Sequence, residues 1–385
     1  MISGTVTILL ALLTAAYVLK GFGFLWGLFQ LNRAKSRREY RVSVVVAARD
    51  EERNIGSCLE ALLNQTYPRE KYEIIIVDDQ STDNTSRIVE SYVRSHSNLT
   101  LLRAGEPEGT RAQKKYALSL GIGKSCGEIV MTTDADCVVA PAWIEGMVSY
   151  FEPEVGLVVG FSQIGSPQEE LTLFERVQAI DFLSLMSAAA GTIGGNIPWA
   201  ASGQNLAYRR EVFDQVGGFG KVGHRASGDD VLLLQLVVKE TDWKVRFSIS
   251  EETFVTTRPE KTVGALLNQR RRWASNSTYQ LKLNKGFFAF LAATFALNLL
   301  LCITVPLSLF VQSLSLAPWL SLLAKATIDF AVISKGARLF RRQDLLLYFP
   351  IWEILHVPYI VLAGLLGVTG SFTWKERSYC QQGLL

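Results

Sequence analysis

Three groups of carboxylates and one cationic segment are the residues of this chain that are best suited to do chemistry. In chain order they are Asp78-Asp79, Asp134-Ala135-Asp136, Asp229-Asp230 and Gln269-Arg270-Arg271-Arg272-Trp273. The first two groups each follow an apolar run, at 73–77 and 129–133, where a strand would end. Carboxylates at the ends of parallel strands are well placed to bind a metal ion and a nucleotide.

Each acidic group also has a structural explanation. Asp134-x-Asp136 suits Mg²⁺ or Mn²⁺, which take one or two carboxylates together with substrate phosphates, although any strand-to-loop turn can carry two aspartates. Asp229-Asp230 precedes an apolar run at 231–238, so one of the pair could cap a helix there. Two adjacent like charges also raise the pKa of one group, which suits a general base.

The other two groups offer recognition chemistry. Asp78-Asp79 can accept hydrogen bonds from a base or a ribose, and Asp83 is the better candidate for capping the helix that follows. Gln269-x-x-Arg272-Trp273 supplies an amide, a fixed cation and a flat aromatic face. Arginine presents a bidentate fork to a diphosphate, while three consecutive arginines also suit lipid headgroups.

The segments between these groups alternate between strand-like and helix-like patterns. Strands are expected at 42–47, 73–77, 99–103 and 129–133, and helices at 55–63, 83–92 and 114–120. Such alternation predicts an α/β fold with a mostly parallel sheet, whose ligands bind at the carboxyl ends of the strands. Two longer helical patterns, at 168–190 and 262–283, could lie on the inner membrane surface, and the first could equally pack on the domain's own core.

Both ends of the chain are apolar enough to enter a membrane. Residues 2–31 carry one charge, Lys20, and residues 286–324 carry none. Because about 20 apolar residues span a bilayer, we expect an N-terminal anchor at 1–31 and about three transmembrane helices within 286–370, two of them separated near Pro318. A retained anchor is favoured over a signal peptide because no small-residue cleavage site follows the apolar run.

The basic residues predict the orientation and the remaining boundaries. Arg33, Lys35, Arg37, Arg38 and Arg41 follow the first anchor, so the positive-inside rule predicts an integral inner (cell) membrane protein with a cytoplasmic catalytic domain at 40–260. An interfacial helix at 261–285 and a tail at 371–385 complete the chain. Five cysteines without paired spacing and three scattered histidines argue against disulfides and a zinc site. The net charge of +3 is uninformative, and no nucleic-acid partner is expected.

Taken together, five segments resemble the membrane-bound family 2 glycosyltransferases, which have a GT-A fold. They are Val44 to Glu52, Val77 to Thr85, Asp134-Ala135-Asp136, Gly228-Asp229-Asp230 and Gln269 to Trp273. The closing Phe372-x-Trp374-Lys375-x-Arg377-x-Tyr379 is similar to the tail of members that act on lipids, such as ceramide or carotenoid glucosyltransferases.

The resemblance implies a role for each matching position. In the expected donor site, the first nucleotide loop contains Ala47, Arg49 and Glu51, and the aspartates that bind the base or ribose are Asp78 and Asp79. The basic position is Lys114, and the closing motif contains Gln269, Arg272 and Trp273. Asp134 and Asp136 match the metal–diphosphate motif. Asp230 matches the catalytic base, with Asp229 beside it and Arg272 assisting. Gly203, Asn205 and Trp273 match the acceptor side.

The function implied is inverting transfer of a sugar from a nucleotide-sugar, expected to be a UDP-hexose, with Mg²⁺ or Mn²⁺ as cofactor. Four membrane helices look too few to enclose a sugar channel, so we expect a membrane-lipid hydroxyl as acceptor at the cytoplasmic face. A processive polysaccharide synthase is the alternative, because such enzymes also carry Gln-x-x-Arg-Trp. A non-catalytic membrane scaffold is disfavoured by the presence of Asp136 and Asp230.

Overall fold

The computed structural model describes residues 2–34, 36–106, 112–311, 316–369, 372–374 and 377–379. The chain forms two compact units. The sheet unit comprises Leu31–Glu169 and Asn196–Pro259, and the helical unit comprises Met1–Gln30, Glu170–Gly195 and Glu260–Leu385. The catalytic domain expected at 40–260 is therefore interrupted, because Glu170–Gly195 packs with the two ends of the chain. Lys35 and most of the expected tail at 371–385 lie outside the described residues.

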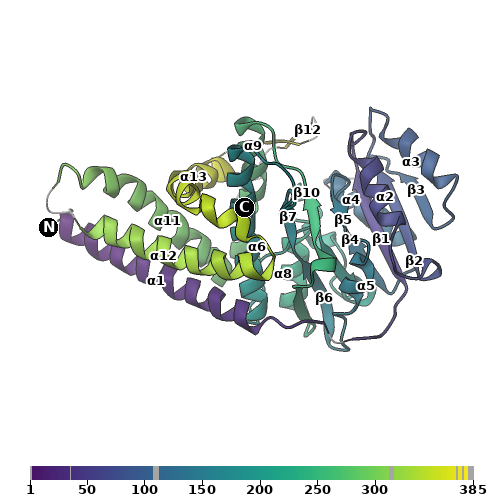
Figure 1. The fold of residues 1–385 in the computed structure, drawn as a ribbon, viewed down its shortest axis with the longest axis horizontal. Coiled ribbons are helices and arrows are strands. Elements are labelled where there is room, and N and C mark those ends of the chain that lie inside the picture. Colours follow the sequence, from purple (N-terminus) through teal and green to yellow (C-terminus); the bar gives the residue numbers. More distant parts are fainter. Residues whose placement is uncertain are drawn as a thin grey trace. The chain divides into compact units, whose positions relative to one another are not determined.

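The sheet unit is built on a seven-stranded sheet in the order β3-β2-β1-β4-β8-β6-β9 (Figure 1). Its strands are β1 (Val42–Ala48), β2 (Tyr72–Asp78), β3 (Leu99–Arg103), β4 (Ile129–Thr132), β6 (Val155–Gly160), β8 (Leu206–Arg209) and β9 (Lys244–Ser248). The first four are parallel, as predicted. β8 is antiparallel to both of its neighbours, which the sequence pattern did not reveal.

Helices and a small second sheet complete this unit. The helices are α2 (Ile55–Leu63), α3 (Thr85–Val93), α4 (Gln113–Lys124), α5 (Trp143–Val148), α7 (Arg210–Gln215) and α8 (Val231–Glu240), with 3-10 turns at Arg69–Lys71, Gly220–Val222 and Glu251–Thr253. The second sheet joins β5 (Val138–Val139), β10 (Val255–Thr257) and β7 (Ser162–Ile164). The β-branched residues of β1 are almost all buried because helices cover both faces of the main sheet.

Helix α4 lies unusually close to the main sheet. A Cβ atom on Gly121 would lie 2.5 Å from a methyl group of Val45 and 2.9 Å from one of Val77. Only glycine avoids these contacts, so α4 is seated directly on β1 and β2. The close seating also fixes the position of Lys114 and Lys115, which α4 carries in its first turn.

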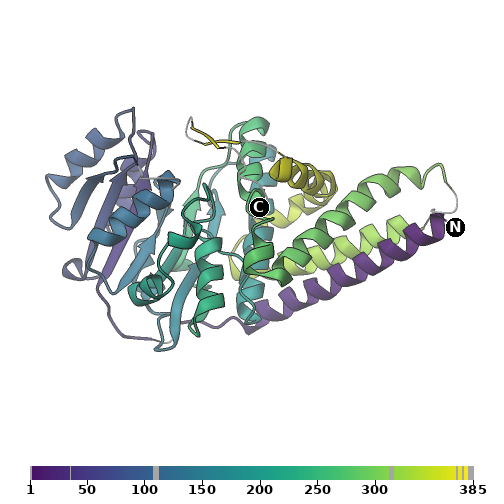
Figure 2. The same ribbon diagram turned by 180° about the vertical axis from the view of Figure 1, so that it is seen from behind.

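The helical unit gathers segments from three parts of the chain. It comprises α1 (Ile2–Gln30), α6 (Leu173–Gly194), α9 (Val263–Ala274), α10 (Gln280–Leu283), α11 (Lys285–Leu307), a 3-10 turn (Gln343–Tyr348), α12 (Ala317–Leu339), α13 (Phe349–Thr369) and the hairpin β11 (Phe372–Trp374) and β12 (Arg377–Tyr379). Figures 1 and 2 show α1, α11 and α12 running side by side. Among the described residues, five helices are long and apolar enough to cross a membrane: Gly4–Gln30, Leu173–Gly194, Lys285–Leu307, Ala317–Leu339 and Gln343–Gly367.

Three helices of the helical unit differ from the expectation. Leu173–Gly194 was read as amphipathic, yet it is mostly buried within the helical unit. α12 begins at Ala317 and runs to Leu339, beyond the uncharged stretch, with Pro318 in its first turn, where a missing N–H costs little. The helix expected at 262–283 ends at Ala274, and the short α10 follows after a break.

Glycines let the backbones of α1, α6 and α12 meet. A Cβ atom on Gly27 would lie 1.9 Å from the carbonyl oxygen of Gly191, and one on Gly191 would lie 2.5 Å from that of Phe24. A Cβ atom on Gly336 would lie 1.9 Å from the Ser187 hydroxyl. Small residues at helix crossings are the usual means of close packing between membrane helices.

Candidate active site

The carboxyl ends of β1, β2 and β4 meet at one edge of the sheet because these strands are parallel neighbours. Asp79 directly follows β2, is only 2% exposed, and its N–H donates to the carbonyl of Ala48 at 2.8 Å. Asp134 lies two residues beyond the end of β4. Asp78, the last residue of β2, and Asp134, which the sequence predicted for the strand ends, are therefore on the same rim of the sheet unit, with Asp79 beside them.

The loops after β1 and β2 are held together by hydrogen bonds. The guanidinium of Arg49 donates to the carbonyl of Asp79 at 2.8 Å, and the Asp50 carboxylate accepts from the Thr82 N–H at 2.7 Å. Asp50 and Gln80 both adopt left-handed backbone conformations, with φ of 50° and 59°. Such strain in non-glycine residues is concentrated at functional sites. The predicted nucleotide loop with Ala47, Arg49 and Glu51 is thus fixed beside Asp79.

Asp78 is used differently from Asp79. Its carboxylate accepts hydrogen bonds from the Ser81 N–H at 3.2 Å and from the Ser86 hydroxyl at 2.7 Å. Asp83 in turn accepts from the Thr85 N–H at 2.9 Å, at the start of α3. The geometry gives Asp78 a structural role in the β2–α3 turn, and its predicted contact with a nucleotide stays a prediction.

Lys114 brings two of the acidic groups together. From the first turn of α4, its Nζ lies 2.8 Å from Asp134 Oδ1 and 3.0 Å from Asp229 Oδ2. Asp136 lies two residues beyond Asp134 on the same turn and is likewise half-buried. Asp134 and Asp229, from two distant segments of the chain, therefore meet at the Lys114 ammonium, and the donor- and metal-binding roles expected for these residues stay predictions.

The Asp230 carboxylate is held rigidly at the start of α8. Its Oδ1 accepts from the N–H of Val231 at 2.6 Å, and its Oδ2 accepts from the N–H of Gly203 at 2.8 Å. Gly228, with φ of +80°, supplies the left-handed turn that leads into the pair. A Cβ atom on Gly203 would come within 3.0 Å of Asp229 Oδ2, so glycine permits this close approach.

The two adjacent carboxyls have opposite pKa shifts. Burial raises the pKa of Asp230, and the negative charge of Asp229 raises it further. For Asp229 burial acts in the same direction, but Lys114 and Lys115 outweigh it and leave its pKa below the usual value. A pair whose environments separate its pKa values is the usual arrangement for assigning one group as a base. In this pair Asp230 is the group with the raised pKa, and its role as the base stays a prediction.

Asn205 belongs to the core. It is fully buried, its Oδ1 accepts from Trp143 Nε1 at 2.9 Å, and its Nδ2 donates to the carbonyls of Phe161 at 2.9 Å and Thr253 at 2.7 Å. All of these bonds tie β8 to neighbouring elements. The predicted acceptor-side role of Asn205 stays a prediction, whereas Gly203 directly contacts the Asp230 carboxylate.

Sequence reasoning missed Lys115. This lysine is 2% exposed, and its ammonium donates to the carbonyls of Arg225 at 2.6 Å and Ser227 at 2.7 Å. Burial lowers its pKa to about 8, although Asp229 and Asp230 act in the opposite direction. The signal was its spacing from Leu118 and Ile122, which places all three on the buried face of α4.

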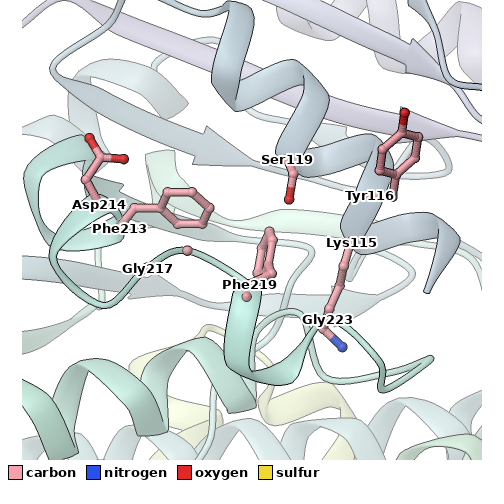
Figure 3. A pocket seen from close by; sticks show the side chains of 10 residues that line it. Lys115, Tyr116, Ser119, Phe213, Asp214, Gly217, Phe219 and Gly223 are labelled. Atoms are coloured by element: carbon pink, nitrogen blue, oxygen red, sulfur yellow. The ribbon is translucent and has the colours of Figure 1, made fainter. Parts of the chain in front are cut away.

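A pocket of about 330 Å³ lies beside this lysine (Figure 3). Lys115, Tyr116 and Ser119 line it from α4, and Phe213, Asp214 and the segment from Gly217 to Gly223 line it from the other side. The Phe213 and Phe219 rings meet edge to face at 5.2 Å. None of the carboxylates predicted to bind the donor lines this pocket.

In the helical unit, Arg270 and Arg271 make contacts that hold α9 in place. Arg270 is 3% exposed, with its guanidinium 2.8 Å from the Asp181 carboxylate and 4.1 Å from the centre of the Trp273 ring. Arg271 donates to the carbonyl of Leu366 at 3.2 Å. These contacts hold α9 to α6 and α13, so neither arginine is simply a lipid-facing cation.

Gln269 donates to Glu260 at 2.9 Å, and the donor-site roles of Gln269, Arg272 and Trp273 stay predictions.

A second ionic cluster lies among the long helices. Lys325 Nζ is 2.7 Å from Asp329, 2.8 Å from Glu353 and 3.2 Å from His356 Nδ1. Lys325 and Asp329 therefore form an ion pair across one helical turn. Asp329, Glu353 and His356 are close enough together to hold a metal ion, but the ammonium of Lys325 already supplies the positive charge. The cluster therefore pairs the buried Lys325 ammonium with the carboxylates of Asp329 and Glu353.

Comparison with known proteins decides the family. A family model described as "Glycosyl transferase family 2" matches residues 43–217. Glycosyltransferase AglE of Haloferax volcanii is 30% identical over 237 residues, which cover 60% of this chain and 71% of that protein. The chain belongs to glycosyltransferase family 2. The resemblance seen in the sequence motifs is confirmed at this level.

Further members extend the comparison. A beta-monoglucosyldiacylglycerol synthase of Synechocystis is 30% identical over 247 residues, which cover 61% of this chain and 47% of that enzyme, so the chain spans about half of its length. The solved mannosyltransferase PcManGT of Pyrobaculum calidifontis, in complex with GDP-Man and Mn²⁺, superposes with a TM-score of 0.61 at 21% identity. That alignment covers 94% of this chain and 99% of PcManGT, and it supports the GT-A fold of the family 2 domain.

Proposed function

We propose that this family 2 glycosyltransferase moves a sugar from a nucleotide-sugar donor to a hydroxyl group of a membrane lipid, with inversion at the anomeric carbon. The observation that carries the proposal is the convergence of Asp134 and Asp229 on Lys114, at 2.8 and 3.0 Å, next to the rigidly held Asp230. A donor-binding acid, a cation and a candidate base within one cluster are what glycosyl transfer needs.

The rim formed by β1 and β2 is the proposed nucleotide site. Asp79, beside the loop of Ala47, Arg49 and Glu51, would recognise the base or the ribose through its carboxylate. Lys114 would contact the diphosphate. The cocrystallised GDP-Man of PcManGT supports a nucleotide-sugar donor for this fold, and UDP-hexose is the donor that the motif resemblance favours.

Asp134 and Asp136 are the proposed ligands of Mg²⁺ or Mn²⁺. Both carboxylates are half-buried and lie two residues apart on the turn after β4, so their oxygens suit a hard divalent ion that completes its shell with phosphates and water. Once bound, such an ion neutralises charge on the diphosphate. The Mn²⁺ in PcManGT is consistent with this choice.

The proposed reaction uses Asp230 as general base. Its carboxylate takes the proton of the acceptor hydroxyl, and the acceptor oxygen bonds to the anomeric carbon from the face opposite the nucleotide. The bond between that carbon and the diphosphate oxygen breaks, and the nucleoside diphosphate leaves with the electron pair. The N–H groups of Gly203 and Val231 keep the base in position, and its raised pKa makes it a stronger proton acceptor than an ordinary aspartate.

Two observations favour a lipid acceptor. Five described helices have the length and hydropathy of membrane spans, which would keep the enzyme at the surface where lipid hydroxyls lie. The similar Synechocystis protein is named for a glucosyldiacylglycerol product.

The basic residues after α1 favour the cytoplasmic face, since Arg33, Arg37 and Arg38 follow the first span.

The test is an assay with purified enzyme in lipid nanodiscs, supplied with radiolabelled UDP-glucose or GDP-mannose. Label that partitions into organic solvent supports a lipid acceptor, whereas label found only in water-soluble polymer would identify a polysaccharide synthase. Asp230→Asn should lower turnover by about 10²–10⁴-fold while donor binding is retained. The exposed Asp242→Asn is the matched control. Near-normal turnover of Asp230→Asn would refute the assignment of the base.

A further inference from the structure

We propose that Lys115 is a positioning residue, which clamps the loop that carries Asp229 and Asp230 onto helix α4. This inference rests on the proposed function, since it concerns the alignment of the proposed base. The hydrogen bonds of the Lys115 ammonium go to the main chain of the loop before Asp229, so its effect on the reaction is exerted through that loop.

The clamp consists of hydrogen bonds to the main chain. The Lys115 ammonium donates to the carbonyls of Arg225 and Ser227, at 2.6 and 2.7 Å, within five residues of Asp230. Hydrogen bonds from a charged donor are about twice as strong as those between neutral groups. A third bond, from the Ala112 N–H to the carbonyl of Gly223 at 2.7 Å, ties the same loop to the start of α4.

Helix α4 is a firm support for this clamp. Gly121 seats it directly on β1 and β2, as described above. Its two adjacent lysines then act on one loop in different ways, because Lys114 holds the Asp229 side chain and Lys115 holds the backbone before it. Figure 3 shows the Lys115 side chain running from α4 towards Gly223, while Tyr116 and Ser119 line the adjoining pocket.

Loss of the clamp should disturb catalysis more than donor binding. The Asp230 carboxylate depends on two short contacts, at 2.6 and 2.8 Å, which a small shift of the loop would break. A displacement of about 1 Å in a catalytic group can cost roughly 10²-fold in rate. The nucleotide rim after β1 and β2 has its own hydrogen bonds and would keep its geometry.

The experiment compares Lys115→Met, Lys115→Arg and Lys124→Met in the full-length enzyme. Lys124→Met removes a positive charge from an exposed position on the same helix and should leave kinetics unchanged. We expect kcat of Lys115→Met to fall by about 10–100-fold with the donor KM within about threefold, and Lys115→Arg to recover part of kcat. Hydrogen–deuterium exchange of residues 224–232 should rise in Lys115→Met, with other segments unchanged.

Two results would overturn the proposal: a wild-type kcat in Lys115→Met, or an arginine variant with no advantage over methionine. Should Lys115→Met fail to fold, Lys115→Gln is measured instead, because its amide can still reach one carbonyl. Hydrogen–deuterium exchange of the same loop must then rise, and unchanged exchange refutes the clamp.

Asp230→Asn is assayed in parallel. If it stays active, the proposed base is wrong; if it is inactive while Lys115→Met is normal, only the clamp is wrong.

Discussion

Asp229 and Asp230 are neighbours in the chain but have different surroundings. Asp229 reaches a lysine side chain, whereas Asp230 accepts hydrogen bonds from two backbone N–H groups and caps α8. The lysine favours the ionised form of Asp229, and that fixed charge then disfavours ionisation of Asp230. Burial is the larger cause of the raised pKa of Asp230, and the charge of Asp229 adds to it.

This dependence predicts a shift in pH profile for Asp229→Asn. The substitution removes a charge that raises the pKa of Asp230, so Asp230 loses its proton at a lower pH. The acidic limb of kcat/KM should move to lower pH, and the plateau should fall because the base is weaker. Kinetics between pH 4 and 9 measure the shift, with Asp242→Asn as control. Movement of the limb to higher pH would contradict the assignment.

A second residue-scale prediction concerns Arg270. Its ion pair with Asp181 is buried on both sides, so Arg270→Met would leave an unpaired carboxylate inside the helical unit. Removing one partner of such a pair typically costs about 3–5 kcal/mol. Thermal melts of the solubilised protein should show a much larger loss than Arg271→Met, which removes a single bond to the Leu366 carbonyl. Equal melting of the two variants would argue against a structural role for Arg270.

At the scale of elements, the crossing of α1 and α6 depends on glycine. Gly27→Ala would force a Cβ atom against the backbone of Gly191, whereas at Gly23, on the same helix, nothing lies within 4 Å. We expect Gly27→Ala to destabilise the protein by about 1–3 kcal/mol and Gly23→Ala to have little effect. Thermal melting in detergent measures the difference, and an equal response of both variants would show that this crossing does not limit stability.

The elements that were predictable are those whose signal is local. The β-branched run of β1, the apolar run of β2 and the aspartates that follow β2 and β4 predicted the parallel strands and the rim where Asp79 and Asp134 lie. The four residues of β8 gave no such signal, and its antiparallel direction is decided by pairing with β4 and β6. Lys115 was readable only from its place on the buried face of α4.

The location of helix α6 is decided by its ion-pair partners and not by its sequence periodicity. Glu175 and Asp181 made its sequence look amphipathic, typical of a helix on a surface. In the structure Glu175 pairs with Lys261 and Asp181 with Arg270, both from distant segments, and the helix is mostly buried. A single sequence cannot report such pairings, so the placement of α6 in the helical unit could not be derived from its periodicity.

For the whole molecule, thiol labelling tests the proposed membrane orientation. Among the described cysteines, Cys126 and Cys302 are exposed and Cys58 and Cys137 are buried. In a Cys380→Ser background, an impermeant maleimide should label Cys126 in inside-out vesicles but not in intact cells. Cys302 lies within the candidate span Lys285–Leu307 and should be protected in both. Labelling of Cys126 in intact cells would contradict a cytoplasmic sheet unit, and Cys126→Ser is the control.

The three-part origin of the helical unit has a consequence for biosynthesis. Its first helix emerges from the ribosome at the start of translation, its second after residue 173, and the helices that cover both only after residue 285. The sheet unit has its last strand by Thr257. During synthesis the glycine faces of α1 and α6 can pack on each other once α6 is complete, but a nascent chain stalled before residue 317 would lack α12, whose Gly336 lies against Ser187. The contact between α6 and α12 therefore forms only late in translation, after the sheet unit has all of its strands.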